Sequence, residues 1–225
     1  MEQELLQRLA ECIEFGKINI SSPYPPQMKG QEGADELTVK ALEVGISPQN
    51  VLTFGLMIGM EKVGKKFSEN LIFVPQMLMS AKAMGIALLH LKPHFLSGAA
   101  KQKGIFIIGT VHGDLHDIGK NLVGMLVEGS GYKVIDLGVD VNSEKFISAL
   151  KENPGAVVGL SALLTTTMTN MERITKEIKE AVPGTVVTIG GAPVNEDFCN
   201  KIGADHYSAD PQGIVDYINK IIMSN

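Results

Sequence analysis

Asp114 and His116 stand directly after an apolar run, in the segment TVHGDLHDIGKNLVG that extends from Thr110 to Gly124. The run before them, GIFIIGT, predicts a buried strand, and the apolar spacing after them predicts a helix. An imidazole is a good ligand for first-row transition metals, and a ligating histidine usually donates its other N–H to a carboxylate or carbonyl. The alternative is a helix start, in which Asp114 or Asp117 caps the free amides. The segment is therefore a candidate metal site or an ordinary helix cap.

Two further apolar runs end in residues that suit a ligand site. AVVGLSA leads into Ser161 and Leu163 and then three threonines, 165–167, and TVVTIGG ends in Gly190 and Gly191. Each has an ordinary explanation, because threonines form turns and glycines permit positive φ. No phosphate loop of the GxGxxG or GxxxxGK[ST] type follows the first run. In a doubly wound sheet, however, these three ends converge on one rim, where ligands bind.

The second half of the chain, from Gly104, alternates short apolar runs with amphipathic segments. The runs GIFIIGT, YKVIDLG, AVVGLSA, TVVTIGG and the weaker DHYSA each precede a helical pattern. One helix passes through Leu122, Leu126 and Val127, and the others are expected over 143–152, 168–181, 195–202 and 211–223. Five such units predict an α/β domain with a flavodoxin-like, doubly wound, parallel five-stranded sheet.

The first half shows apolar residues at helical spacing and no strand pattern, so we expect a helical bundle. The four expected helix faces comprise Leu5, Leu6, Leu9 and Ile13; Leu37, Ala41 and Leu42, ending near Gly45; Leu52, Leu56, Met60, Val63 and Phe67; and Met77, Ala81, Met84, Leu88 and Leu91. The segment from Lys92, with Pro93 and Gly98, predicts a connection. We assign residues 1–95 to the bundle, 96–103 to the linker and 104–225 to the α/β domain.

Composition restricts the function classes. The chain is 44% hydrophobic and 20% charged, as in a soluble globular protein, and its net charge of -5 argues against nucleic-acid binding. Cys12 and Cys199 are far apart, which fits a reducing compartment. No signal peptide and no run of about 18 apolar residues is visible. We expect a cytoplasmic protein with neither a nucleic-acid nor a membrane partner.

The spacing of the three strand ends is specific. The pattern D-x-H-x-x-G ends at Gly119, 41 residues precede the S-x-L that begins at Ser161, and 26 residues separate Leu163 from Gly190. This pattern resembles the cobalamin-binding family, which includes the cobalamin module of methionine synthase and adenosylcobalamin-dependent mutases. The resemblance covers the whole second half and implies a Rossmann-like B12-binding domain.

The resemblance implies a role for each motif residue. His116 would coordinate the cobalt of cobalamin or a related corrinoid from below, with Asp114 as its hydrogen-bond partner and the hydroxyl of Thr167, where methionine synthase has serine, as the third member. The nucleotide tail of the corrinoid would enter a slot beside the sheet. The expected cofactor contacts are Asp114, His116, Asp117, Ile118, Gly119, Ser161, Leu163, Thr165, Thr167, Gly190 and Gly191.

The implied chemistry is methyl transfer. Cobalt(I) is a nucleophile that favours four coordination, whereas methyl-cobalt(III) tolerates a lower ligand, so the His116–cobalt contact would be made and broken. A released imidazole would tend to take a proton, and Asp114 would stabilise the imidazolium.

The stretch from Val63 to Met84, VGKKFSENLIFVPQMLMSAKAM, resembles the helical cap that precedes the cobalamin module. The cap would shield the upper face of the corrin, and Pro75 suits a first helical turn. The candidate cover residues are Phe73, Val74, Met77 and Met84. The alternative is that these apolar residues form the bundle's own core.

The length implies a stand-alone corrinoid protein, since no room remains for a substrate barrel of about 250 residues. Such a protein is not catalytic alone. It carries a methyl group from a substrate-specific methyltransferase to a second one that uses tetrahydrofolate or coenzyme M, with a reductive activase as a further partner. Donors in such families are methanol, methylamines, methylated thiols, betaines and methoxylated aromatics.

The loop SPYPPQMKGQEGADELT resembles aromatic O-demethylation systems. Two alternatives to a methyl carrier stay open: a cobalamin-dependent sensor or regulator, and a flavodoxin-like binding domain without corrinoid.

Overall fold

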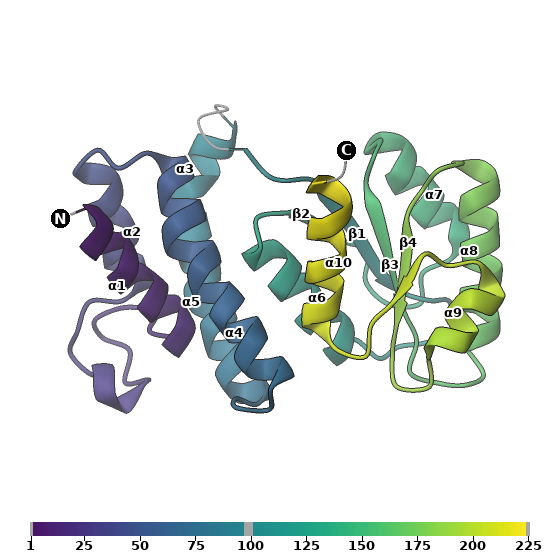
Figure 1. Cartoon of the computed structure of the whole chain (residues 1–225), viewed down its shortest axis with the longest axis horizontal. Coiled ribbons are helices and arrows are strands. Elements are labelled where there is room, and N and C mark those ends of the chain that lie inside the picture. Colours follow the sequence, from purple (N-terminus) through teal and green to yellow (C-terminus); the bar gives the residue numbers. More distant parts are fainter. Residues whose placement is uncertain (1, 97–100, 224–225) are drawn as a thin grey trace. The chain divides into compact units, whose positions relative to one another are not determined.

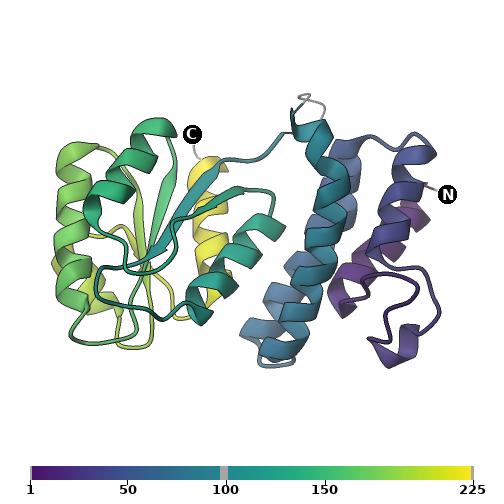
Figure 2. The ribbon, with the colours of Figure 1, turned by 180° about the vertical axis from the view of Figure 1, so that it is seen from behind.

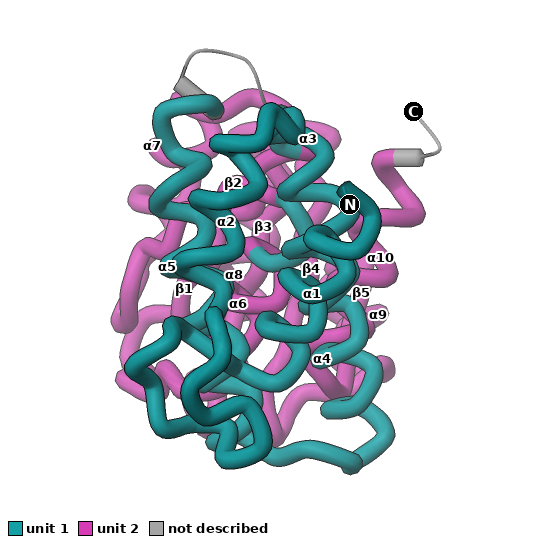
Figure 3. The backbone as a smooth tube through the Cα atoms, turned by 90° about the vertical axis from the view of Figure 1, so that its left-hand side faces the viewer, with its two compact units in different colours: residues 1–102, 129–131 teal, residues 103–128, 132–225 magenta. Residues whose placement is uncertain are grey.

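The computed structural model of the chain describes residues 2–96 and 101–223. It divides into two compact units, residues 1–102 with 129–131 and residues 103–128 with 132–225 (Figure 3). Part of the predicted linker 96–103, residues 97–100, lies outside the described residues. Each unit is described below by itself.

Unit 1 is helical, as the apolar spacing predicts (Figures 1 and 2). A short 3-10 turn, η1 (Pro26–Met28), lies between the first two helices, and α3, the π-helix η2 and α4 follow one another directly. Ser47 begins this third segment, since its hydroxyl accepts from the Asn50 N–H at 3.1 Å. The main helices are α1 (Glu2–Phe15), α2 (Ala34–Glu43), α3 (Pro48–Asn50), η2 (Val51–Met57), α4 (Ile58–Ser68) and α5 (Val74–Leu96).

The helices of unit 1 pack closely because two glycines face α1. A Cβ on Gly55 would lie 2.8 Å from Leu9, and a Cβ on Gly59 would lie 2.6 Å from the carbonyl oxygen of Ala10 and from Cβ of Ile13. These distances are shorter than side chains tolerate. The glycines therefore set how near η2 and α4 approach α1.

Helix α5 differs from two sequence expectations. It continues to Leu96 and includes Pro93, where a connection was predicted. Pro93 lies in the last turn, so its missing N–H removes a single helical hydrogen bond near the end. Its segment Val74–His94 is also long and apolar enough to cross a membrane by length and composition, a test that core helices of globular proteins pass as well. Its packing against α1, α2 and α4 is that of a bundle helix.

Unit 2 contains the predicted five-stranded parallel sheet. The strand order is β2-β1-β3-β4-β5, the flavodoxin-like order. Neighbouring strands are in register at their carboxyl ends, where Thr110 pairs with Ser161 and Ser161 with Gly190. The strands are β1 (Ile105–Thr110), β2 (Lys133–Asp136), β3 (Val157–Ser161), β4 (Val187–Gly190) and β5 (His206–Tyr207).

The two faces of the sheet are covered by different helices (Figure 1). The core on one face joins Ile107, Val158 and Ile189 of the strands to buried residues of α7, α8 and α9, such as Phe146 and Met171. Helices α6 and α10 lie on the opposite face. The helices are α6 (Ile118–Gly129), α7 (Ser143–Glu152), α8 (Met168–Ala181), α9 (Glu196–Ile202) and α10 (Pro211–Met223).

Two glycine-to-alanine substitutions in unit 1 should have opposite effects on stability. Gly59→Ala forces α4 away from α1 and should lower the free energy of unfolding by about 1–3 kcal/mol. Gly85→Ala is the matched control, because a Cβ there meets nothing within 4 Å. It should raise the free energy of unfolding by about 0.5–1 kcal/mol, the difference in helix propensity. Urea unfolding followed by circular dichroism measures both. A stabilised Gly59→Ala variant would contradict the close approach of these helices.

Candidate functional site

Three loops meet at the carboxyl edge of the sheet because β1, β3 and β4 end in register. The loop after β1 carries Asp114 and His116, the loop after β3 carries Leu163 to Thr167, and β4 runs into Gly191. This edge is the place where ligands bind in doubly wound sheets. The structure thus brings together residues that are up to 77 positions apart, from Asp114 to Gly191.

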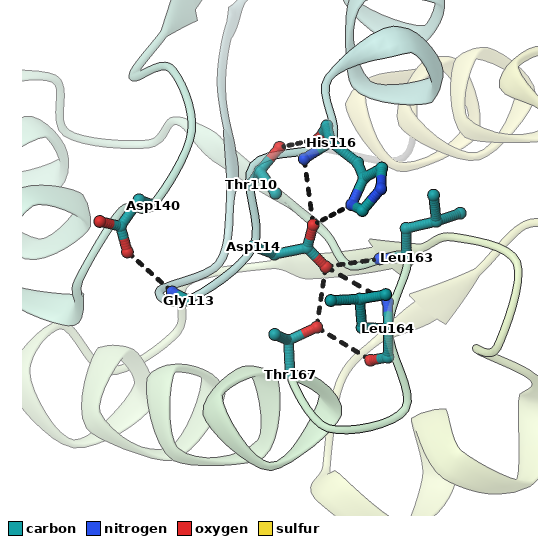
Figure 4. Close-up of polar contacts among 8 residues, drawn as sticks. All are labelled: Thr110, Gly113, Asp114, His116, Asp140, Leu163, Leu164 and Thr167. Atoms are coloured by element: carbon teal, nitrogen blue, oxygen red, sulfur yellow. Dashed lines mark hydrogen bonds and ion pairs between the residues drawn. The ribbon is translucent and has the colours of Figure 1, made fainter.

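Asp114 is the centre of this arrangement (Figure 4). Its side chain is 0% exposed, and its Oδ1 accepts from the backbone N–H of His116 at 3.1 Å and lies 2.8 Å from Nδ1 of the same residue. Its Oδ2 accepts from the N–H groups of Leu163 at 2.8 Å and Leu164 at 3.3 Å, and lies 2.8 Å from the Thr167 hydroxyl. One carboxylate therefore joins the loop after β1 to the loop after β3.

These contacts keep Asp114 ionised. Burial alone would raise the pKa of its carboxyl group, but the hydrogen bonds from the Leu163 N–H, from the backbone and ring of His116 and from the Thr167 hydroxyl outweigh it. The pKa of Asp114 is consequently held well below its usual range. The group is a buried anion at neutral pH that can accept hydrogen bonds and has none to donate.

The ionised carboxylate fixes the tautomer of His116. Because Asp114 only accepts, Nδ1 must carry the proton, and Nε2 presents its lone pair. Nε2 has no hydrogen-bond partner among the described residues, and the side chain is 51% exposed. The Thr110 hydroxyl donates to the His116 carbonyl at 2.8 Å and holds the loop against the strand. The arrangement leaves one nitrogen available as a metal ligand.

Thr167 occupies the position expected for the third hydroxyl. Its Oγ1 lies 2.8 Å from Asp114 Oδ2 and also 2.8 Å from the Leu164 carbonyl oxygen. A hydroxyl has one proton, so Thr167 donates to one of these oxygens at a time. Asp114, His116 and Thr167 are thus adjacent, in the order that the resemblance implies.

The helix-cap alternative does not describe Asp114. Its oxygens bind the His116 loop and the loop after β3, and neither accepts from an amide of α6 in the described chain. Asp117 is nearer to the start of α6, and its Oδ2 accepts from the Asn121 side-chain amide at 3.1 Å. Asp114 is therefore used to position His116, and Asp117 directly precedes α6.

A cavity of about 670 Å³ opens beside His116 on the sheet face that α6 and α10 cover. This volume lies within the range of small-molecule sites. Of the predicted cofactor contacts, Asp114, Thr165 and Thr167 are not part of its lining: Asp114 and Thr167 are buried and Thr165 is exposed. The predicted residues that line it are His116, Asp117, Ile118, Gly119, Ser161, Leu163, Gly190 and Gly191.

Several cavity residues were not predicted. Phe106 and Ile108 on β1, Gly159 on β3 and Thr188 on β4 line it, and period-two alternation places them on the same side as Ser161 and Gly190. That alternation was the available signal in the sequence. The segment after β4 and β5 also contributes to the wall, although nothing in its sequence pattern marked it. Its lining residues are Ala192, Tyr207, Ser208, Ala209, Asp210, Pro211 and Ile214.

The three predicted glycines serve different purposes. A Cβ on Gly119 would meet nothing within 4 Å, and one on Gly190 would lie 3.7 Å from the Ser208 carbonyl oxygen, so both positions keep the cavity wide. Gly191 has φ +128°, and its Cβ would lie 1.8 Å from the Ala162 carbonyl oxygen. Glycine is required at position 191 because its backbone lies against the Ala162 carbonyl oxygen. This requirement does not depend on whether a ligand is bound.

The candidate cap residues separate into two pairs. Met77 and Met84 are buried, at 0% and 2% exposure, which agrees with the core-filling alternative. Phe73 is 63% exposed and Val74 is half-buried. Phe73 and Val74 therefore remain as residues that can offer apolar surface to a ligand.

Two family models match this chain, and both describe a B12 binding domain. One matches residues 104–213, which include all of the cavity lining except Ile214, and the other matches residues 30–92 in the helical unit. The matches coincide with the two types of structure that the periodicity predicts.

Known proteins resemble the chain over most of its length. The trimethylamine corrinoid protein 1 of Methanosarcina mazei is 37% identical over 85% of this chain and 91% of its own length. A corrinoid protein of Desulfitobacterium hafniense is 36% identical over 83% of this chain and 89% of its own. The methanol:cobalamin methyltransferase complex of Methanosarcina barkeri contains a chain with a TM-score of 0.82 and 30% identity, over 99% of this chain and 81% of that one.

These similarities agree with the geometry at the sheet edge, where a histidine with a free Nε2 stands beside a large cavity. The chain belongs to the family of B12-binding corrinoid proteins.

Proposed function

We propose that this protein carries a methyl group on the cobalt of a bound corrinoid and exchanges it with partner methyltransferases. The observation that carries the proposal is the Asp114–His116 pair, whose free Nε2 stands at the cavity in unit 2. Nε2 is the lower ligand of the metal in this proposal, and the cavity takes the nucleotide tail.

The residues present fit such a cofactor. Leu115, Ile118 and Leu163 are 71%, 70% and 43% exposed around His116, so apolar surface is available for a flat macrocycle. Below them the cavity is lined largely by apolar side chains and by glycine, and its polar lining residues include Ser161, Thr188, Ser208, Lys120 and Asp210. Gly119 and Gly190 leave open the space that a Cβ would enter.

A bound corrinoid would supply a metal that accepts and releases a methyl group, and Asp114 and His116 would hold that metal. Asp114 orients the ring and keeps the proton on Nδ1, so that Nε2 is ready to coordinate. When Nε2 is not coordinated, Asp114 holds the ring through the same contact to Nδ1. The ring thus keeps one position in both situations.

A methylamine is the donor that the relatives support. The corrinoid proteins of Methanosarcina mazei and Methanosarcina barkeri are named for trimethylamine and dimethylamine and cover most of this chain. The predicted likeness of residues 22–38 to aromatic O-demethylation proteins stays a prediction. That segment lies within unit 1, and its first residue is bound by Lys17, whose Nζ donates to the Ser22 carbonyl at 2.8 Å.

The partners follow from the carrier role. The structural relative from Methanosarcina barkeri is part of a methyltransferase complex, which supports a substrate-specific methyltransferase as the first partner. A second methyltransferase that uses tetrahydrofolate or coenzyme M, a reductive activase and a cytoplasmic location remain predictions. Phe73 and Val74 are our proposed contacts to the upper face of the corrin.

Methyl transfer can be tested directly with the intact chain. We expect the protein, loaded with hydroxocobalamin and reduced, to accept a methyl group when a methylamine methyltransferase and its substrate are both present. Mass spectrometry of the protein-bound corrinoid, with isotopically labelled trimethylamine, dimethylamine or methanol as donor, measures the transfer. Omission of the methyltransferase is the control. If no donor and transferase pair labels the corrinoid, the carrier function is wrong.

Substitution of His116 tests the lower ligand. His116→Ala should change the visible spectrum of the bound corrinoid to that of a form without an imidazole ligand and weaken cofactor retention. Added free imidazole should restore part of the spectrum, because it can enter the space that the side chain leaves. His90→Ala, which removes a histidine of unit 1, is the control. A wild-type spectrum in His116→Ala would rule out the ligand role.

Asp114→Asn should trap His116 in the wrong tautomer. Three donors face the Oδ2 position, so the asparagine oxygen is expected there and its NH2 group faces His116. Nδ1 must then accept, and the proton moves to Nε2, which can no longer bind a metal. We expect loss of the imidazole-type spectrum and a lower stability by about 1–3 kcal/mol.

The ¹⁵N chemical shifts of the ring nitrogens report the tautomer even without cofactor. Asp117→Asn is the matched control, since Asp117 contacts the Asn121 side chain and not the imidazole. An Nδ1-protonated ring in Asp114→Asn would contradict the role assigned to the carboxylate.

A further inference from the structure

Asp140 lies on the loop between β2 and α7, outside the family motif. Its side chain is 49% exposed, and its backbone adopts φ +53°, a conformation that residues other than glycine rarely take. Such a conformation persists where surrounding contacts require it. In Asp140 those contacts are all directed to the loop that carries His116.

The turn before Asp114 is held by Asp140 from one side (Figure 4). Asp140 Oδ1 accepts from the Gly113 N–H at 2.7 Å, and the Asp140 N–H donates to the Asp114 carbonyl at 3.0 Å. The same Oδ1 lies 2.7 Å from Nδ1 of His112. Asp140 therefore orients the peptide group between His112 and Gly113 and the one between Asp114 and Leu115.

A second side chain also holds this turn. Asn170, in the first turn of α8, donates from Nδ2 to the His112 carbonyl at 2.7 Å. The turn itself is closed by the Asp114 N–H, which donates to the Val111 carbonyl at 3.1 Å, and Gly113 has φ +83°. The His112 carbonyl is thus held by α8, and the Asp114 N–H is held within the turn.

The geometry points to Asp140 as a positioning residue for the lower ligand, supported by Asn170. By fixing the backbone on both sides of Asp114, Asp140 sets where the buried carboxylate lies, and the carboxylate sets where His116 Nε2 lies. Asp140 touches neither Nε2 nor the cavity lining. It acts through Asp114, so its removal should weaken the coordination of the metal more than it weakens the fold.

This inference rests on the proposed function, because it assumes that His116 coordinates the metal. The two proposals concern different residues. A protein in which Nε2 of His116 is misplaced can still bind a corrinoid, so the role of Asp140 can fail while the proposed function holds. A ligand that must be released and rebound depends on being held within a fraction of an ångström of its bonding position.

The test uses the whole chain loaded with methylcobalamin. The visible spectrum gives the ratio of histidine-bound to histidine-free cofactor. Asp140→Gly removes the side chain and relieves the positive φ, so backbone strain does not contribute. We expect this ratio to fall about tenfold, the scale of one hydrogen bond to a charged group, while methylcobalamin stays bound.

Asp205→Gly is the matched control. Asp205 makes the same two kinds of hydrogen bond to a backbone. Its Oδ2 accepts from the Val187 N–H at 2.7 Å, and its own N–H donates to the Val187 carbonyl at 2.8 Å. Val187 begins β4, at the sheet edge away from His116. We expect Asp205→Gly to lower the unfolding midpoint at least as much as Asp140→Gly and to leave the spectral ratio unchanged.

The possible results separate the two proposals. An unchanged ratio in Asp140→Gly, in a series where His116→Ala loses the imidazole-type spectrum, overturns the positioning role and leaves the proposed function intact. An equal fall of the ratio in Asp205→Gly also overturns it. A wild-type spectrum in His116→Ala overturns both. If Asp140→Gly does not fold, Asn170→Ala is measured against the same controls and the same outcomes apply.

Discussion

The buried carboxylate of Asp114 is the constraint on which the site depends. An ionised group without solvent contact is costly unless several donors compensate it. Here the donors come from two loops. Some of them are backbone N–H groups, such as that of Leu163, and these reach Asp114 only when the loop itself is in place. The loops after β1 and β3 must therefore close on Asp114 for the fold to be stable. The orientation of His116 follows from the same requirement, so stability and ligand geometry are satisfied by one set of contacts.

The parallel sheet makes this closure possible. Its register puts Thr110, Ser161 and Gly190 side by side, so the loops that follow start from a common edge. The face toward α7, α8 and α9 is filled by a continuous apolar core, which keeps the strands in place. The opposite face is hollow near the same edge. The packed core on one face of the sheet and the cavity on the other allow a large ligand to enter without disturbing the strands that hold the loops.

Much of this arrangement was predictable because it is local or periodic. Apolar spacing predicted the helices and strands, and the resemblance to the cobalamin-binding family implied that Asp114, His116 and Thr167 meet. Contacts that depend on tertiary structure were not predictable. The burial of Met77 and Met84 follows from helix packing, since an apolar residue at helical spacing can face the core or a ligand. The cavity wall after β5 likewise depends on where α10 returns to the sheet.

Asp140 shows a further limit of sequence reasoning. An aspartate in a loop between a strand and a helix has no pattern that marks it, because exposed aspartates are common there. Its importance appears only when its backbone conformation and its bonds to the neighbouring loop are known. In our proposal His116 binds the metal reversibly, and such a ligand would gain from this indirect support. Direct packing on the imidazole would occupy the space that the macrocycle needs, whereas hydrogen bonds to the backbone behind Asp114 leave Nε2 uncovered. The support for a ligand that must remain accessible is therefore expected behind it, on a loop that touches neither the metal nor the cavity.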